Sequence, residues 1–294
     1  MTKDFNSNAN APKKRYTKEE YAQYKQNEKE KVYQAIDEMI TLVSTNPEAL
    51  QAYLDTQARV DRYSAANALL IMKQCPEATQ LKDYADWVEE NVNIKKGAKA
   101  ISILEPVEYT KKDGTQGISY NVKKVFDVSQ TTARKAPAPT AVTDTSKYVA
   151  ALLDSSDVKY ELVDTMLLPN TFAQYDNEKA TVFIKQGVGA EYGISLFQQL
   201  AREMSLAEIA LNSEVYNRNE AGFAATCSAY MLCKKYGVDT RAFSVGIPEK
   251  WDSMSKQEIR GDLSKARQTM SSIHSKMYGE LSRQRQEREQ DYAR

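Results

Sequence analysis

The sequence predicts an α+β protein, with N-terminal helices, a β-hairpin or small antiparallel sheet, a second α+β domain and a long C-terminal helix. Three observations support this class. Apolar residues recur at helical spacing up to about residue 90, and alternating, β-rich runs follow. Residues 131–146, TTARKAPAPTAVTDTS, have prolines and few large apolar groups, which is the composition of a linker. Beyond residue 255 the chain is highly charged and helical in pattern.

These changes of pattern divide the chain into five segments. We expect a disordered tail over residues 1–16, which has no apolar period, and a first domain over residues 17–132. A linker over residues 133–146 leads to a second domain over residues 147–247. A charged helical tail covers residues 248–294.

Three helices are predicted at the start of the first domain. The first covers residues 16–43 and has an apolar face near its end, formed by Val32, Ile36, Ile40 and Leu42. Asn46 is an N-cap and Pro47 the first residue of a second helix, which runs to about residue 60. Ser64 caps a third helix, which stops before Pro76.

A β-hairpin is predicted to follow. Its strands are the alternating runs KAISILEPVEYT and ISYNVKKVFDVSQ, and its turn contains Asp113 and Gly114. The first domain is therefore helical at its start and β-rich at its end.

The second domain begins with a short helix, SKYVAALLDSS, and continues into strands. The run NTFAQYDNEKATVFIK is a hairpin that turns at Asp176 and Asn177. Helices are expected over residues 190–211 and 215–236, the latter ended by Gly237, and a last helix runs from Ser255 to the end.

Charge and cysteine content favour a cytoplasmic protein. Acidic and basic residues balance at 40 each, so any nucleic-acid binding depends on local clusters. The cysteines, Cys75, Cys227 and Cys233, form no short paired spacing, which fits a reducing compartment. The chain has no apolar run of the ~18 residues that a membrane span needs, and the polar N-terminus lacks the apolar core of a signal peptide. We expect no membrane association.

Lysines and aromatic residues are interleaved around the predicted hairpin. Residues 91–124 contain seven lysines and three carboxylates, a net charge of +4. Amines that follow phosphates, beside rings that stack on unpaired bases, suit single-stranded nucleic acid. The alternative interpretation is a solvated lysine-rich face with Trp87 in the core.

The order of the residues in this region resembles the N-terminal single-stranded-DNA-binding domain of ArdC-type antirestriction proteins and of LtrC-like proteins of conjugative elements. The resemblance covers roughly residues 40–132 and rests on Tyr63-Ser64, Asn67, Gln74 with Pro76, Trp87, Lys96-Gly97 with Lys99, and Phe126-Asp127. The family has a Gly-Arg step before the Lys-Gly pair, whereas this chain has the more acidic VEENVNIKKG.

The resemblance and the lysine-aromatic pattern together define the expected DNA-binding residues. They are Tyr63, Ser64, Asn67, Gln74, Trp87, Lys95, Lys96, Lys99, Tyr120, Lys123, Lys124 and Phe126. For Asn67 two interpretations stay open: an amide that serves the binding face, or an internal hydrogen bond that satisfies a turn.

The segment QQLAREMSLAEIALNSEVYNRNEAG, residues 198–222, resembles the metal-binding helices of the family's second, zincin-like domain. That pattern is His-Glu-x-x-His followed by an acidic residue on the next helix, and it places two imidazoles and a carboxylate on one metal ion. In this register Arg202 and Leu206 stand at the two histidine positions, Glu203 at the glutamate position and Glu220 at the third ligand.

The residue types at these positions argue against metal catalysis. An arginine side chain has no lone pair to donate to a metal, and leucine has no donor atom. The single histidine, His274, lies on the tail helix, where we expect it to be exposed. We therefore expect no metal, no cofactor and no catalytic residues, in a degenerate zincin-like domain where Arg202 pairs with Glu203 or Glu220 in place of a metal.

The expected function is that of a single-stranded-DNA-binding protein of a mobile or conjugative element, which protects transferred DNA from restriction. Conjugation or restriction proteins are further expected partners. Two alternatives remain: a hydrolase with an unorthodox metal site, and a protein-interaction factor of the conjugation machinery that uses its long helices.

Overall fold

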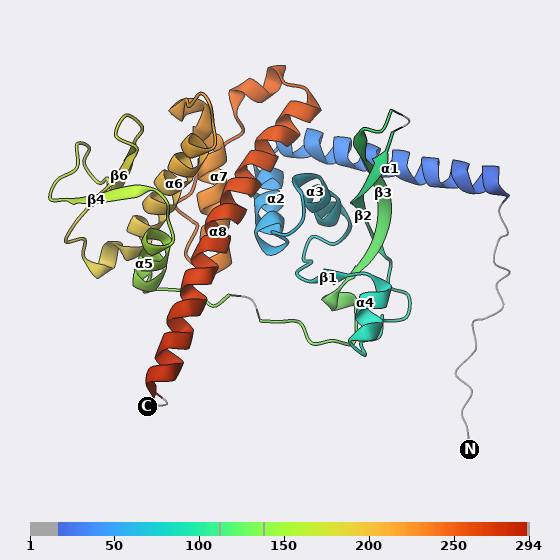
Figure 1. The fold of residues 1–294 in the computed structure, drawn as a ribbon, viewed down its shortest axis with the longest axis horizontal. Coiled ribbons are helices and arrows are strands. Elements are labelled where there is room, and N and C mark those ends of the chain that lie inside the picture. Colours follow the sequence, from blue (N-terminus) through green and yellow to red (C-terminus); the bar gives the residue numbers. More distant parts are fainter. Residues whose placement is uncertain (1–16, 112, 138, 293–294) are drawn as a thin grey trace.

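The computed structural model describes residues 17–111, 113–137 and 139–292 of the chain. The tail expected to be disordered, residues 1–16, lies outside the described residues. The fold is a mixed α+β fold with two small sheets and a long C-terminal helix, as predicted (Figure 1). Among the described residues, no helix is both long enough and apolar enough to cross a membrane.

Helices and a three-stranded sheet form the first half. The helices are α1 (Lys18–Thr45), α2 (Pro47–Arg59), α3 (Ala65–Gln74) and the short α4 (Tyr84–Glu89). The strands are β1 (Leu81–Lys82), β2 (Ile101–Thr110) and β3 (Gln116–Asp127), and all pairs are antiparallel in the order β1-β3-β2. The hairpin β2–β3 was expected, whereas β1 is too short to be recognised by alternation.

The second half contains a small mixed sheet and the last helices. Helix α5 (Ser146–Asp154) precedes β4 (Lys159–Val163), β5 (Ala173–Asp176) and β6 (Thr181–Lys185). The sheet order is β4-β6-β5, with β4 parallel and β5 antiparallel to β6. Helices α6 (Gly193–Leu211), α7 (Arg218–Tyr236) and α8 (Lys256–Tyr292) complete the chain.

The predicted caps and turns are present. Asn46 Oδ1 accepts a hydrogen bond from the Ala49 N–H at 2.8 Å and begins α2. The Ser64 hydroxyl caps α3 in the same way, with the Asn67 N–H as donor. Gly237 ends α7 in the left-handed conformation, with φ of 71°, where a side chain is unfavourable.

Two helix predictions differ from the structure. Leu42 does not lie on the buried face of α1, since its exposed fraction is 42%, and Met39 and Val43 take its place. At 100° per residue, position 42 is more than half a turn away from position 40, whereas position 43 returns to the same face. Helix α7 begins at residue 218 and not at 215, because the Asn217 side chain caps it.

One hydrophobic core joins the two halves. Helix α2 packs against α7, and α8 packs against α1 and α3 as well as α5, α6 and α7 (Figure 1). The two halves share this core. Helix α8 therefore packs against helices of both halves. The division into two domains at residues 133–146 stays a prediction.

Candidate nucleic-acid interface

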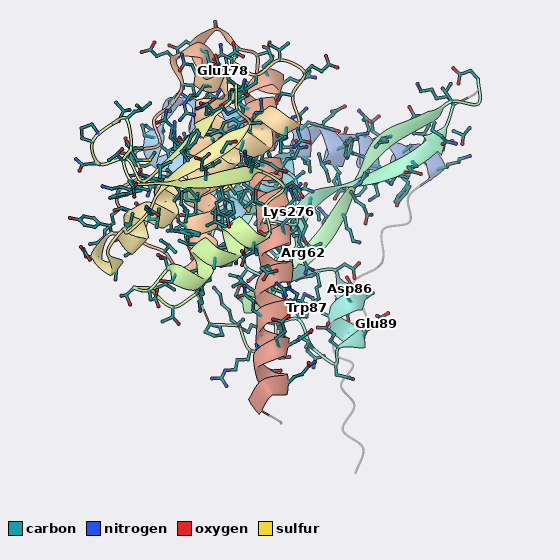
Figure 2. All side chains as sticks on the ribbon, turned by 60° about the vertical axis from the view of Figure 1, so that its left-hand side comes forward. Arg62, Asp86, Trp87, Glu89, Glu178 and Lys276 are labelled. Carbon is teal, nitrogen blue, oxygen red and sulfur yellow. The ribbon has the colours of Figure 1, made fainter. Side chains whose placement is uncertain are left out.

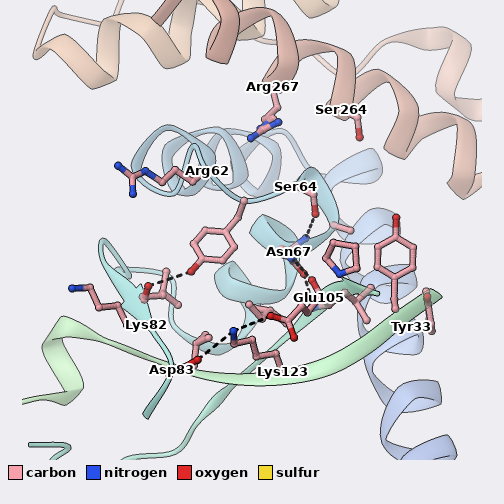
Figure 3. Close-up of a pocket in the computed structure, with 18 of the residues that line it drawn as sticks. Tyr33, Arg62, Ser64, Asn67, Lys82, Asp83, Glu105, Lys123, Ser264 and Arg267 are labelled. Atoms are coloured by element: carbon pink, nitrogen blue, oxygen red, sulfur yellow. Dashed lines mark hydrogen bonds and ion pairs between the residues drawn. The ribbon is translucent and has the colours of Figure 1, made fainter. Parts of the chain in front are cut away.

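A groove of about 690 Å³ opens where α1, the α2–α3 turn, the β2–β3 hairpin and α8 meet (Figure 3). Three of its lining residues are aromatic: Tyr33 from α1, Tyr63 from the turn and Tyr120 from β3. Tyr120 has an exposed fraction of 41%, and Tyr63 is half-buried. Burial raises the pKa of Tyr63, whose hydroxyl donates a hydrogen bond to the Leu81 carbonyl at 3.3 Å.

The cations of the groove are of two kinds. Its two lysines are already paired with acids: Lys82 with Glu90, and Lys123 with Asp83 at 3.2 Å and Glu105 at 2.8 Å. The hydrogen bond with Glu105, followed by that with Asp83, raises the pKa of Lys123, so this ammonium stays charged but neutralised.

The three arginines of the groove have no acidic partner among the described residues. They are Arg62 from the turn and Arg260 and Arg267 from α8. Arg267 donates two hydrogen bonds to the backbone carbonyl of Asp61, at 3.1 and 2.8 Å, which fixes its position without cancelling its charge. The cations of the groove without a direct acidic partner are therefore guanidinium groups, and they share the groove with the Asp86 carboxylate.

These arginines were not among the residues predicted from the sequence. The prediction followed lysine density near the hairpin, and Arg260 and Arg267 lie more than 130 residues beyond it. Their spacing of seven places them on one face of a helix, but only the packing of α8 shows which groove that face lines.

Two of the predicted DNA-binding residues, Asn67 and Gln74, hold the strand β2 against the helix α3. The Asn67 Nδ2 donates to the Leu104 carbonyl and its Oδ1 accepts from the Leu104 N–H, both at 2.8 Å. Gln74 repeats this pattern with Ser102, at 3.0 and 2.8 Å. Because β2 is an edge strand, these side chains of α3 satisfy backbone groups that would otherwise stay unpaired. For Asn67 the internal hydrogen bonds are thus the observed role.

Other predicted DNA-binding residues also have internal partners. Trp87 is 1% exposed, and its indole N–H donates to the Phe126 carbonyl at 3.0 Å. Ser64 is the α3 cap, and Phe126 is half-buried on β3. Trp87 therefore offers no open ring face for a base.

The remaining predicted lysines lie away from the groove. Lys95, Lys96 and Lys99 are exposed on the segment between α4 and β2, where Lys95 Nζ donates to the Ser129 carbonyl at 2.8 Å. Lys124 faces α1 and pairs with Glu28 at 2.7 Å. Of the twelve predicted residues, the groove brings together Tyr63, Ser64, Asn67, Tyr120 and Lys123. That any of the twelve contacts DNA stays a prediction.

The distal part of the hairpin carries exposed apolar side chains. It projects away from the helical body (Figure 2), and its apolar side chains Val107, Tyr109, Ile118 and Tyr120 are all exposed. Tyr120 and Pro106, directly opposite each other on the two strands, line both the groove and the base of this arm. Beyond Tyr120, Tyr109 is the one further aromatic ring among these side chains, and by the alternation of the strand it lies on the opposite face of the hairpin from Pro106 and Tyr120.

The second predicted site is a buried ion cluster around Glu203 of α6. The Glu203 side chain is 6% exposed, and Arg218 Nη2 donates to both of its carboxylate oxygens, at 2.8 and 2.7 Å. Arg202 Nη1 donates to Oε1 at 2.9 Å and the Tyr175 N–H to Oε2 at 2.8 Å. All the donors to this carboxylate are guanidinium or backbone N–H groups.

This cluster joins α6, α7 and the small sheet. Arg218 of α7 binds Glu203 of α6 and also donates to the Tyr175 carbonyl of β5 at 3.1 Å. The Arg202 Nε donates to Thr226 Oγ1 of α7 at 3.1 Å. Arg202 makes no direct ion pair with Glu220, which is exposed. Arg218 was missed, since the family pattern directs attention only to the ligand positions.

His274 is not exposed, contrary to expectation. Its side chain is 16% exposed, its Nδ1 lies 2.9 Å from the Tyr236 hydroxyl, and its Nε2 lies 3.7 Å from Asp61. Burial, aided by Lys235 and opposed by Asp61, lowers the pKa of His274 to about 4. The residue follows the buried Ile273 on α8 and lies where this helix packs on α7, which the charged local sequence does not reveal.

Comparison with known proteins found a curated sequence relative and similar solved structures. No family model matches the chain. The uncharacterized protein pXO2-81 of Bacillus anthracis is 23% identical over 94% of this chain and 56% of its own length. The chain thus spans little more than half the length of this curated relative.

Two solved structures resemble the chain along most of its length. The metal-free crystal structure of the antirestriction protein ArdC from the R388 plasmid has a TM-score of 0.51 and 14% identity, over 74% of this chain and 86% of that one. Its Mn(II)-bound structure has a TM-score of 0.53 and 12% identity, over 85% and 97%.

The residues of this chain do not fit a metal ion at the zincin-like positions. Arg202 and Leu206 supply no ligand atom, and both oxygens of Glu203 are held by guanidinium groups. Within the described ranges, no three His, Cys, Asp or Glu side chains lie close enough together to hold a metal ion.

The resemblance inferred from the sequence is confirmed for the fold. Sequence identity is low, but the match covers both halves, the hairpin half and the half that contains the Glu203 cluster. The chain has the fold of the antirestriction protein ArdC.

Proposed function

We propose that this chain is a single-stranded-DNA-binding protein of a plasmid or other mobile element, that it acts in antirestriction as an ArdC-type factor, and that its second half is not catalytic. The structural relative is described as an antirestriction protein of the R388 plasmid. The groove described above adds the chemistry that such a function needs.

The observation that carries the proposal is the combination of tyrosine rings and unpaired arginines in one groove. Tyr33, Tyr63 and Tyr120 provide rings on which unpaired bases stack, and stacking does not depend on base identity. The arginines provide donors for the phosphates between those bases. A double helix buries its bases, so these rings favour a single strand.

The proposed absence of catalysis rests on the Glu203 cluster. A general base or a metal ligand needs a free lone pair, and the Glu203 carboxylate already accepts four short hydrogen bonds. A hydrolase with unorthodox ligands would instead retain metal after purification and lose it on Glu203→Ala with Glu220→Ala. Metal analysis of the purified chain separates the two possibilities.

The binding proposal is tested by fluorescence anisotropy of the full chain with labelled oligo(dT) and a matched duplex, across a salt series. We expect preference for the single strand and an affinity that falls steeply as salt rises. Absence of single-strand binding at low salt would refute the proposal.

A matched pair of tyrosine variants tests the groove itself. Tyr120→Leu should weaken oligo(dT) binding roughly tenfold, in line with the loss of one stacked base. Tyr160→Leu is the control, because Tyr160 is also 41% exposed and lies on β4 in the other sheet. Equal effects of the two substitutions would place the binding site elsewhere.

The antirestriction role is tested by conjugative transfer into a restricting recipient. Expression of the wild-type chain should raise the recovery of transferred plasmid, and Tyr120→Leu should abolish most of the gain. Recovery that is independent of the chain would refute this part of the proposal and leave DNA binding standing.

A further inference from the structure

The C-terminal helix carries a stripe of polar residues that faces the groove of the first half. Arg260, Ser264 and Arg267 line the groove, and their spacing of four and three residues places them on one side of α8. Ser264 and Arg267 are labelled in Figure 3. Nothing in the hairpin sequence indicates that a residue from the end of the chain completes this wall.

A buried stripe next to it fixes the orientation of the helix. Ile259, Leu263, Ala266 and Met270 are at most 4% exposed and belong to the shared core. Two of the groove arginines directly follow buried residues of this stripe, so each is turned by about 100° from the core. The helix cannot rotate the arginines out of the groove without exposing the buried residues.

The charge of the groove depends on this helix. Lys82 is paired with one carboxylate and Lys123 with two, so these two lysines together with their partners add no net positive charge for a phosphate. Arg62 is then the one cation of the first half that lines the groove without an acidic partner, within the part of the chain that the structure describes. Arg260 and Arg267 supply the other two.

We propose that helix α8 is part of the single-stranded-DNA site, with Arg260 and Arg267 as phosphate-binding residues, so that DNA binding needs both halves of the chain. This inference rests on the proposed function above and deepens it. Guanidinium groups suit the role because they stay charged at all relevant pH values and donate in pairs to phosphate oxygens.

Arg260 is the residue of choice for the test. Its side chain makes no hydrogen bond or ion pair with any described residue, so Arg260→Gln, inside α8, should leave folding intact, as checked by the melting temperature. Arg267 also holds the Asp61 carbonyl and is therefore less suited to substitution.

The experiment measures the affinity of the full-length chain for labelled oligo(dT) as a function of salt concentration. Arg260→Gln should weaken binding and reduce the slope of log affinity against log salt by ~0.7, the value for one phosphate contact on a single strand. Arg260→Lys should restore the slope. The control is Arg285→Gln, an exposed arginine far along the same helix, paired with Glu289 at 3.0 Å, which should change neither quantity.

The outcomes separate this inference from the proposed function. If the wild-type chain binds no single strand, both fail. If it binds and Arg260→Gln behaves like Arg285→Gln, the helix is not part of the site, whereas the DNA-binding function stands. Equal loss of slope in both variants would indicate a general field of the helix and would also overturn the inference.

Discussion

Substitution of Arg218 by methionine tests whether guanidinium groups hold α6 and α7 together at the zincin-like positions. The change keeps an unbranched apolar stem and removes the guanidinium group with its charge. It removes hydrogen bonds to both Glu203 oxygens, at 2.8 and 2.7 Å, and one to the Tyr175 carbonyl at 3.1 Å. Glu203, with a side chain 6% exposed, keeps only Arg202 and the Tyr175 N–H as donors.

The expected loss of stability follows from these contacts. Removing one partner of a buried ion pair costs about 3–5 kcal/mol, because the other charge stays behind in poorly solvated surroundings. The Arg218 side chain is 41% exposed, so water replaces part of its role and the lower end applies. At about 2 °C per kcal/mol for a chain of this length, a loss of about 3 kcal/mol lowers the melting temperature by roughly 6 °C.

Differential scanning calorimetry of four proteins makes the test specific. Arg218→Met should melt well below the wild type, and adding Glu203→Gln should restore part of the loss, because the buried carboxylate that has lost its bidentate partner is then replaced by a neutral amide. Arg241→Gln is the control: it breaks an Arg–Asp pair of similar geometry whose arginine side chain is 90% exposed, and it should not change melting. EDTA and Mn(II) should leave the wild-type melting temperature unchanged.

Two results would refute this reasoning. If Arg218→Met melted with the Arg241→Gln control, the cluster would contribute nothing to stability. If EDTA lowered the melting temperature of the wild type, a bound metal and not the guanidinium groups would join the two helices.

Three further predictions concern a buried amide, a turn and a histidine. Asn67→Ala leaves the Leu104 N–H and carbonyl unpaired and should cost about 3 kcal/mol in urea denaturation; weaker DNA binding at unchanged stability would contradict the structural role. Gly237→Ala places a side chain at φ of 71°, against a backbone carbonyl, and should cost more than about 1 kcal/mol, whereas Gly261→Ala, in open space on α8, should not destabilise. Burial lowers the pKa of His274 to about 4, so the unfolded chain takes up a proton below about pH 6.5 and the folded chain does not. Stability should therefore fall as pH drops from about 6.5 to 4, by on the order of 3 kcal/mol from this group, and His274→Gln should flatten the pH profile.

Much of the fold was predictable because its signals are local. The Asn46 and Ser64 caps, the turn at Gly114 and the left-handed Gly237 each depend on a few neighbouring residues. The parallel pairing of β4 with β6 was not predictable in this way, since it joins segments separated by the β5 hairpin strand.

The candidate site was predicted less completely. The aromatic residues Tyr63 and Tyr120 do line the groove, but Trp87 and Asn67 have internal roles. A residue type that suits a contact with DNA also suits a buried hydrogen bond, such as the one from Asn67 to the edge strand β2. The sequence does not distinguish between these two roles.

The sequence by itself determined that two of the zincin-like positions carry no metal ligand. Arg202 and Leu206 cannot bind a metal whatever the fold, because ligand capacity is a property of the side chain alone. Only the tertiary structure decided which cations are free. Lys123 is neutralised by Asp83 and Glu105, and Arg260 reaches the groove from the far end of the chain, because pairing and proximity depend on packing between distant segments.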